Sequence, residues 1–322
     1  MSGLFPGPLL PRDLANLASQ PLEPAAGTWF TASGHWALRL LLRQCALHPG
    51  ARVAIPALIC PSVVSAICAE GLQPAFVDID PELYLMDFHA DTWFKAHHDA
   101  IVLPHLYGLP HPQTTAIRDF ARTHQIPLIH DAAQSYGIAL DGTPLTHLDQ
   151  GGLISFGPGK ATTAAGGAQV HGLNPATARQ LHLHRLRRWD PCARALLLQR
   201  LGIPRKDPWW WPGSQSVRAS RIQAQAAHLV ISRFAAIEQT RRTHWHQLRH
   251  ILGAELLGTP PARSSYYKFI YRAPRDHWTP PPELHHHPWR RVVFHEATGA
   301  LPHYRALAGT LIEFSTERPL PS

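Results

Sequence analysis

Short apolar runs alternate with stretches of helical spacing through the first half of the chain. The apolar runs are typical of buried strands, and they span Arg52 to Ile55, Pro74 to Ile79, Ala100 to Pro104, Pro127 to His130, Leu153 to Phe156 and Ala168 to His171. The helical stretches before or between them are Trp36 to Leu47, Pro61 to Glu70 and Thr114 to Thr123. This alternation predicts an α/β fold whose mostly parallel sheet is covered by helices on both faces.

Candidate binding residues follow from the direction of the strands, because ligands of such sheets bind at the carboxyl ends. The residues at or just after these ends are Pro56 to Cys60, Asp78, His105 to Gly108, Asp131 to Gln134, and Ser155 with Lys160. Asp131 is the most informative, since a buried carboxylate needs a cationic or hydrogen-bond-donating partner. It could pair with a protonated pyridine nitrogen, or it could cap a helix that follows.

A lysine follows the strand-like run Leu153 to Phe156. Gly157, Pro158 and Gly159 forbid a helix and hold the backbone in a turn, which places Lys160 at the mouth of the sheet. Small and hydroxyl residues surround this lysine, so its amine has little carboxylate to pair with. Such an amine is suited to attack carbonyl groups. The alternative is a surface lysine on a glycine-rich hairpin.

A Ser-Gly turn, Ser33, Gly34 and His35, opens the helical stretch that starts at Trp36. Free backbone N–H groups and the positive end of the helix dipole would bind a phosphate at this turn. The alternative is an ordinary helix start, with Ser33 as the N-cap.

The composition is that of a globular protein with a large and a smaller domain. The chain has 322 residues, of which 45% are apolar, which supports a sizeable core. We expect an N-terminal arm over residues 1–30, a large domain over 31–212 and a small domain over 213–322. No apolar run approaches the about 20 residues that span a bilayer, and no signal peptide is recognisable. We therefore expect a cytoplasmic protein without a membrane partner.

The formal charge of +8 matches anionic small molecules better than nucleic acid, because the arginines are spread through helical segments without a binding motif. Four cysteines without a CxxC pair are expected to be buried thiols. The 23 histidines include the segments HLHRLRRW and HHHPW, which lack carboxylates or cysteines at ligand spacing. No metal site is expected.

Several motifs in a fixed order resemble the DegT/StrS-type aminotransferases, the pyridoxal-phosphate enzymes best known for aminating nucleotide-linked keto-sugars. The similarity runs from about Thr31 to about Leu252 and rests on VAIPALICPSVVSAI, PAFVDIDPELYLMD, LPHLYG, IHDAAQSYG and SFGPGKATTAAGGAQV. It implies fold type I of the transferases that depend on pyridoxal 5'-phosphate (PLP), which is aspartate aminotransferase-like, with a small C-terminal α+β domain. It also implies an amino donor such as glutamate and a homodimer.

The resemblance assigns roles to the residues at matching positions. Lys160 would bind PLP covalently and then move the proton between the cofactor and the substrate carbon, and Asp131 would pair with the pyridinium nitrogen. Gln134 would contact the ring face or its 3-hydroxyl. Ser155 and the turn of Gly34 and His35 would bind the cofactor phosphate. Relatives that dehydrate sugars carry histidine in place of this lysine, so amination is favoured.

The sequence departs from the family pattern at four positions. Cys60 stands where members usually have an aromatic residue stacked on the cofactor, and His35 stands where they have threonine. Loss of a stacking ring should weaken cofactor binding by about 1 kcal/mol or somewhat more. The glutamate of the family's GEGGA segment is Ala165 here. Ser216 replaces an asparagine that reaches the cofactor phosphate of the partner subunit, and its hydroxyl keeps one hydrogen-bond donor.

The C-terminal third holds two candidate substrate residues. Arg218 and Gln223 match the family motif, and Arg218 is a candidate substrate contact. Apolar spacing over Val217 to Leu252 predicts one long helix. The segment SSYYKFIYR predicts a strand that either presents Lys268 to a substrate phosphate or carries it as a solvated lysine on an edge. Trp209 to Trp211 could stack on a base or sugar or pack under a dimer partner.

These features favour a PLP-dependent aminotransferase that moves an amino group from an amino acid, such as glutamate, to a nucleotide-linked keto-sugar in polysaccharide or secondary-metabolite biosynthesis. One alternative is an aminotransferase of a non-sugar carbonyl compound. Another is a family member without efficient catalysis that serves as a regulatory or interaction subunit. The changes at Cys60, Ala165 and Ser216 favour that last alternative, whereas the retained Lys160 and Asp131 oppose it.

Overall fold

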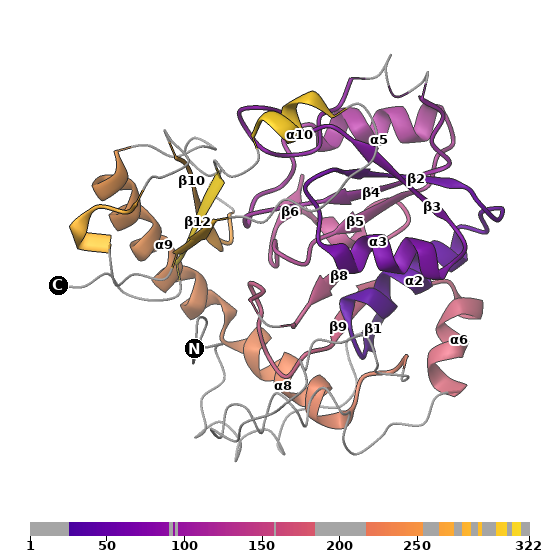
Figure 1. Cartoon of the computed structure of the whole chain (residues 1–322). Helices are drawn as coiled ribbons and strands as arrows, with labels where there is room; N and C mark the ends of the chain where they lie inside the picture. The colour runs from indigo at the N-terminus through magenta and orange to yellow at the C-terminus, as the bar shows by residue number, and fades with distance from the viewer. Residues whose placement is uncertain are drawn as a thin grey trace, which may run out of the picture.

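The computed structural model describes residues 26–89, 93, 96–157, 159–183, 217–253, 264–273, 279–284, 289–291, 301–307 and 311–316 (Figure 1). Its main element is a seven-stranded sheet in the order β1-β9-β8-β5-β4-β2-β3. The strands are β1 (Thr28–Thr31), β2 (Arg52–Pro56), β3 (Gln73–Val77), β4 (Ala100–Pro104), β5 (Leu128–Asp131), β8 (Gly152–Ser155) and β9 (Ala168–His171). Strands β3, β2, β4, β5 and β8 are parallel, whereas β9 and β1 pair antiparallel. The predicted fold class is confirmed.

Helices cover both faces of this sheet (Figure 1). α2 (Gly34–Gln44) and α3 (Pro61–Ala69) pack on one face, and α5 (Thr114–Thr123) packs on the other. Ile129 of β5 lies in the apolar cluster with α2 and α3, whereas its neighbour Leu128 lies in the cluster with α5. Successive side chains of a strand point to opposite faces, so the first two residues of β5 are both apolar because both faces are covered.

The sequence pattern does not predict β1. Thr28 pairs with His171 and Thr31 pairs with Ala168, which makes β1 the edge strand next to β9. The large sheet therefore begins within the stretch assigned to the N-terminal arm.

Two helices, α8 (Arg221–Ser232) and α9 (Phe234–Leu252), stand where the sequence predicts one. Arg233 separates them as the C-cap of α8, and its N–H donates to Val230 O at 3.2 Å. α8 and Ile237 near the start of α9 pack on the large sheet, whereas Trp245 and Leu248 later in α9 pack on a small sheet. The prediction of one continuous helix is wrong because apolar spacing continues across the break. Core packing on the large sheet also extends beyond the expected boundary at residue 213.

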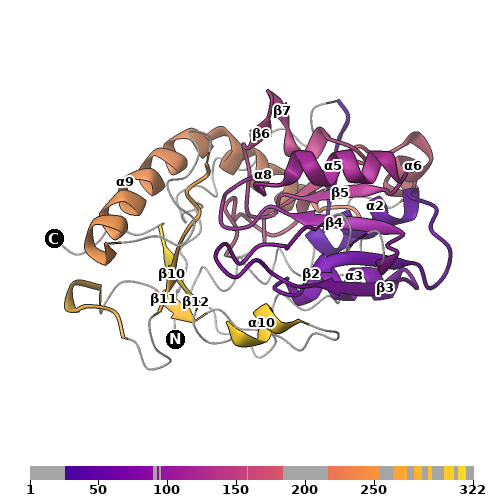
Figure 2. The same ribbon diagram turned by 90° about the horizontal axis from the view of Figure 1, so that it is seen from above.

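A small antiparallel sheet in the order β10-β12-β11 forms the second part of the structure (Figure 2). Its strands are β10 (Lys268–Arg272), β11 (Trp289–Arg291) and β12 (Leu311–Ser315). Trp245 and Leu248 of α9 pack in one cluster with apolar side chains of β10 and β12. The strand predicted in SSYYKFIYR is confirmed over Lys268–Arg272.

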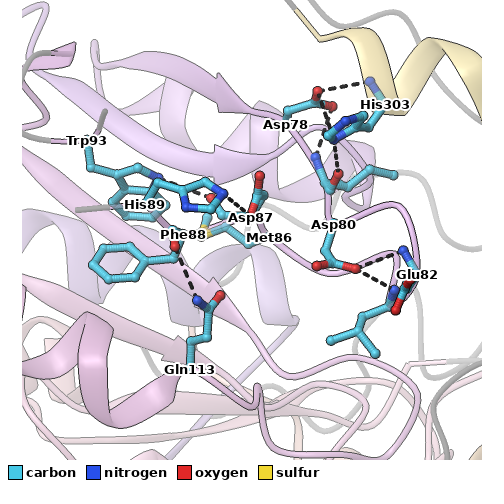
Figure 3. A network of polar contacts seen from close by, with 12 residues as sticks. Asp78, Asp80, Glu82, Met86, Asp87, Phe88, His89, Trp93, Gln113 and His303 are labelled. Atoms are coloured by element: carbon cyan, nitrogen blue, oxygen red, sulfur yellow. Dashed lines mark hydrogen bonds and ion pairs between the residues drawn. The ribbon is translucent and has the colours of Figure 1, made fainter. Parts of the chain in front are cut away.

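Asp78 joins the loop after β3 to α10 (Pro302–Ala306), as Figure 3 shows. Its carboxylate accepts hydrogen bonds from the N–H groups of His303 at 3.0 Å and Tyr304 at 2.9 Å. The N–H of Ile79 donates to the same carboxylate at 2.9 Å. Asp78 is thus a strand-end residue whose contacts hold a helix in place.

Short elements complete the described residues: the hairpin of β6 (Ala139–Leu140) and β7 (Thr143–Pro144), α6 (Pro175–Leu183), and the 3₁₀ helices Leu145–His147 and Pro282–Leu284. None of the helices in this part of the chain combines the length and the apolar character that crossing a membrane requires.

Candidate active site

Asp131 ends β5 at the carboxyl edge of the large sheet, and only 8% of its surface is exposed. Its Oδ1 accepts a hydrogen bond from Ala133 N–H at 2.9 Å. Burial raises the pKa of Asp131, and the positive charge of Lys160 and the bond from Ala133 oppose this rise. A turn follows Asp131 in place of a helix, so the helix-cap alternative is wrong. The structure thus brings a buried carboxylate within electrostatic range of the candidate lysine.

The turn that carries Lys160 is held by its own hydroxyl residues. Lys160 N–H donates to Thr163 Oγ1 at 2.9 Å, and the Thr163 hydroxyl lies 2.7 Å from Lys160 O and 3.1 Å from Gly157 O. Thr162 donates to Ser155 O at 3.0 Å. These bonds fix the backbone of the turn, while the side chain of Lys160 is half-buried and its charge acts on Asp131. That position favours a site lysine over a surface lysine.

The start of α2 lies against the end of β8. Ser33 is the N-cap, and its Oγ accepts a hydrogen bond from Trp36 N–H at 3.3 Å. A Cβ added at Gly34 would lie 3.5 Å from both Cβ and Oγ of Ser155, which is van der Waals contact. The first N–H groups of a helix have no partner within it and form an anion-binding end. The N-cap role of Ser33 is confirmed, and phosphate binding at this turn stays a prediction.

Gln134 links the loops after β4 and β5. Its Oε1 accepts a hydrogen bond from Tyr107 N–H at 2.9 Å. Tyr107 has a φ of 62°, which is unusual for a residue other than glycine, and its hydroxyl donates to Tyr84 O at 3.2 Å. The contact of Gln134 with a cofactor ring stays a prediction. The side-chain oxygen Oε1 of Gln134 already accepts the hydrogen bond from Tyr107 N–H.

His35 and Cys60 both contact Ser62, in the first turn of α3. His35 Nδ1 lies 3.3 Å from Ser62 O, and Cys60 Sγ lies 3.1 Å from Ser62 Oγ. Burial lowers the pKa of His35, which favours its neutral ring. Cys60 and Cys68 are exposed and Cys45 is half-buried, so the prediction of buried thiols is wrong for the first two.

The expected substrate residues occupy different surroundings. Lys268 is buried, and its Nζ lies 3.5 Å from Glu313 Oε1, so the alternative of a solvated lysine is wrong. Arg218 forms an antiparallel β-bridge with the end of β1. The substrate roles of Lys268 and Arg218 stay predictions. Ser216 and Trp209 to Trp211 lie outside the described residues.

Gln223, which matches the family motif, has a structural role. Its Oε1 accepts from Ser220 N–H at 2.9 Å while Ser220 Oγ accepts from Gln223 N–H at 3.3 Å, which forms a capping box at the start of α8. Its Nε2 donates to Ala32 O at 3.1 Å, so it ties α8 to the chain that leads into α2.

Gly108, in the loop after β4, lies in close contact with the segment before β10. Its carbonyl oxygen accepts hydrogen bonds from Ser265 N–H at 2.9 Å and Ser264 Oγ at 3.0 Å. Its φ is +88°, and an added Cβ would lie 2.4 Å from Ser265 Oγ and 2.8 Å from Tyr267 N. Only glycine combines this backbone conformation with such a close approach.

We expect Gly108→Ala to lower the free energy of unfolding by about 3 kcal/mol, because it adds steric overlap with backbone to left-handed strain. Gly71→Ala is the matched control. Gly71 has a φ of +72° with no atom near its added Cβ, so only about 1 kcal/mol is expected. Denaturant unfolding of both variants measures the difference, and equal losses would show that the close contact at Gly108 contributes nothing.

The described site fits PLP on three counts. Asp131 offers a buried carboxylate for the ring nitrogen, and Lys160 offers an amine in its vicinity. The start of α2 with Ser155 offers helix N–H groups and a hydroxyl for a phosphate dianion. The required charges and donors are all at one edge of the sheet.

The family model of the DegT/DnrJ/EryC1/StrS aminotransferase family matches residues 28–279. The chain belongs to this family. The match extends from β1 to beyond β10, and it includes every described candidate residue from Gly34 to Lys268.

Individual relatives of the DegT/DnrJ/EryC1/StrS family support this assignment. The chain is 34% identical over 136 residues to a UDP-N-acetyl-3-dehydro-alpha-D-glucosamine 3-aminotransferase of Acidithiobacillus ferrooxidans, which covers 42% of this chain and 37% of that protein. It is 31% identical over 140 residues to an L-glutamine:2-deoxy-scyllo-inosose aminotransferase of Streptomyces lividus, in an alignment that covers 43% of this chain and 33% of that protein. The alignments thus span about a third of the length of each of these relatives.

The fold agrees with solved structures of the same family. A DegT/DnrJ/EryC1/StrS aminotransferase from Brucella abortus superposes with a TM-score of 0.68 at 20% identity, covering 98% of this chain and 87% of that one. Enzymes of this family depend on PLP, and similar solved structures include forms with PLP and with the pyridoxamine form of the cofactor. Within the described residues, no group of three or more His, Cys, Asp or Glu side chains is arranged to hold a metal ion.

No specific role follows from the sequence for two residues that shape the site, Thr163 and Tyr107. Thr163 stands three residues after Lys160, and a threonine at that spacing in a turn is a signal that could have been used. Tyr107 lies in the strand-end range His105 to Gly108, but its own role depends on a φ of 62° and on a partner from the next strand end, which the sequence does not show.

Proposed function

We propose that this protein is a PLP-dependent aminotransferase that converts a keto-sugar or a similar polyhydroxylated ketone into an amino compound. One observation carries the proposal. Lys160, the buried Asp131 and the start of α2 next to Ser155 lie at one edge of the sheet. A protein freed from catalysis has no physical need for a buried carboxylate beside a lysine.

The residues of the site divide the tasks of this function among them. When bound, PLP supplies an electron-accepting ring that stabilises negative charge on the carbon next to the nitrogen. Asp131 holds the proton on the ring nitrogen. The Nζ of Lys160 takes and returns the proton at the substrate carbon. The start of α2 with Ser155 binds the phosphate and so sets the position of the ring.

The substrates follow from the relatives and the charge of the chain. One relative is named for a nucleotide-linked amino sugar and another for an inosose with L-glutamine as the donor. A nucleotide-linked keto-sugar acceptor, in polysaccharide or secondary-metabolite biosynthesis, is supported by the first name and by the charge of +8, and a donor of the glutamate or glutamine type is supported by the second name. We further propose a homodimer that works in the cytoplasm.

A second candidate is a member that has lost efficient catalysis and acts as a regulatory subunit. The observation that favours it is the exposed Cys60 with its sulfur on Ser62, where the family usually stacks an aromatic ring.

A half-reaction separates the two candidates without knowledge of the acceptor. Purified protein with PLP is mixed with L-glutamate, L-glutamine or L-alanine, and the keto acid product is measured by mass spectrometry. The aminotransferase proposal expects about one keto acid per bound cofactor, with further turnover once a keto-sugar is added. Bound cofactor without any keto acid product from these donors would favour the regulatory subunit.

A further inference from the structure

A row of buried histidines lies under the edge of the sheet that carries Asp131. His111 N–H donates to His105 Nδ1 at 3.0 Å, His105 Nε2 lies 3.0 Å from His130 Nδ1, and His130 Nε2 lies 2.8 Å from Asp149 Oδ2. The rings of His105 and His130 are fully buried and stacked, with 5.3 Å between centroids and 12° between planes.

The partners at the two ends fix where every proton lies. His105 Nδ1 accepts from a backbone N–H, so its proton must be on Nε2, which then donates to His130 Nδ1. His130 in turn carries its proton on Nε2 and donates to the carboxylate of Asp149. Arg118 of α5 donates to the same oxygen at 2.8 Å. The three bonds of the row run in one direction, from His111 N–H in the loop after β4 to Asp149, and Arg118 donates to the same carboxylate from the helix on this face.

The charges around the row agree with this direction. Burial and the nearby His130 and His111 lower the pKa of His105 well below its usual value, so its ring stays neutral. Burial disfavours the charged form of Asp149, but hydrogen bonds from His130 and Arg118 outweigh this and lower its pKa. A neutral His105 ring at the start of the row and an ionised Asp149 carboxylate at its end therefore fit the direction of the hydrogen bonds.

The row is tied to both ends of the segment that carries Asp131. His130 is the residue before Asp131, and strand alternation places its ring on the α5 side. His105 N–H donates to Asp131 O at 2.9 Å, and Ser135 Oγ donates to His105 O at 2.7 Å. His105 thus fixes the backbone on the carboxyl side of Asp131, and the His130 ring is fixed directly before it.

We propose that His105 and His130 are positioning residues that fix the Asp131 carboxylate for the cofactor ring through the hydrogen-bonded row from His111 N–H to Asp149. This rests on the proposed function. Buried polar rows are stabilising only when every member is satisfied, and they then select one geometry more sharply than apolar side chains do. The row lies where Asp131 needs one fixed position.

The test replaces His130 by phenylalanine, which keeps a ring and removes both hydrogen bonds, and by asparagine, which keeps an acceptor toward His105. The matched control is His171→Phe. His171 is a buried histidine of β9 that bonds to Thr28 Oγ1 at 3.2 Å and shares the register partner Gly152 with His130. The readouts are the thermal midpoint, the Kd for PLP and the split between kcat and KM.

We expect both phenylalanine variants to lower the thermal midpoint, but only His130→Phe to weaken PLP about tenfold and to lower kcat, with partial recovery in His130→Asn. Equal effects of His130→Phe and His171→Phe on the Kd for PLP would overturn the proposal, as would no effect of either.

Histidine ¹⁵N spectra of the protein without cofactor test the row independently of catalysis. The His105 resonances are expected to show a neutral ring with the proton on Nε2, and those of His130 are expected to show a proton on Nε2 toward Asp149. A proton on Nδ1 of either ring would contradict the row even if the variants fail to fold. If wild-type protein binds no PLP, the proposed function fails, whereas the spectra still decide whether the row exists.

Discussion

Replacing Lys160 by alanine is expected to abolish amino transfer, with turnover at least about a thousandfold lower than in the wild type. The substitution removes both the amine that binds the cofactor covalently and the group that moves the proton at the substrate carbon. The fold should persist, because the turn is held by the backbone of Lys160 and by Thr163, and not by the lysine side chain. Donor-dependent keto acid formation measures the loss.

Lys160→Arg is the control for this variant. Arginine keeps a positive charge near Asp131, yet its guanidinium does not condense with carbonyl groups at neutral pH. Activity lost in both variants would assign the effect to the amine, whereas activity retained in Lys160→Arg would show that only the charge matters. Undiminished turnover in Lys160→Ala would refute the mechanism.

Asp131→Asn is expected to lower kcat by roughly a hundredfold to a thousandfold while most of the bound cofactor is retained. Asparagine has nearly the same shape and still accepts the hydrogen bond from Ala133 N–H. It carries no negative charge, so it cannot hold the proton on the ring nitrogen. Because burial raises the pKa of Asp131, removing the charge should not lower the free energy of unfolding.

Asp99→Asn serves as the matched control for Asp131→Asn. The Asp99 carboxylate also accepts a backbone hydrogen bond, from Arg52 N–H at 2.7 Å, but it lies at the amino end of the strands. Stopped-flow and steady-state kinetics should show wild-type kcat for Asp99→Asn. Equal kcat for the Asp131→Asn variant and the wild type would mean that the buried carboxylate has no part in catalysis.

The parts of the fold that could be predicted are those in which local pattern and tertiary packing agree. Strands β2, β4, β5 and β8 are apolar on both faces, and α5 has its predicted bounds, Thr114–Thr123. β1 could not be predicted, because it is a short edge strand defined by its pairing with β9. The break at Arg233 could not be predicted, because the apolar spacing of α8 continues into α9. Only the packing of Trp245 and Leu248 on the small sheet distinguishes the two helices.

The site divides in the same way. The rule that ligands bind at strand ends brings Asp131, Ser155 and Lys160 to one edge, and the structure agrees with that placement. The contact of Gly34 with Ser155 joins residues far apart in the chain, and no local pattern encodes it. The histidine row could not be predicted for the same reason, because His105 and His130 come into contact only when β4 and β5 pair.

Borohydride trapping followed by peptide mapping tests the central role of Lys160 most directly. Purified protein is incubated with PLP, its visible absorption band is recorded, and borohydride is added before digestion and mass spectrometry. We expect a band that borohydride removes, with the reduced cofactor attached to the peptide that contains Lys160. A cofactor trapped on another lysine, or no band at saturating PLP, would contradict the assignment of Lys160 as the cofactor-binding residue.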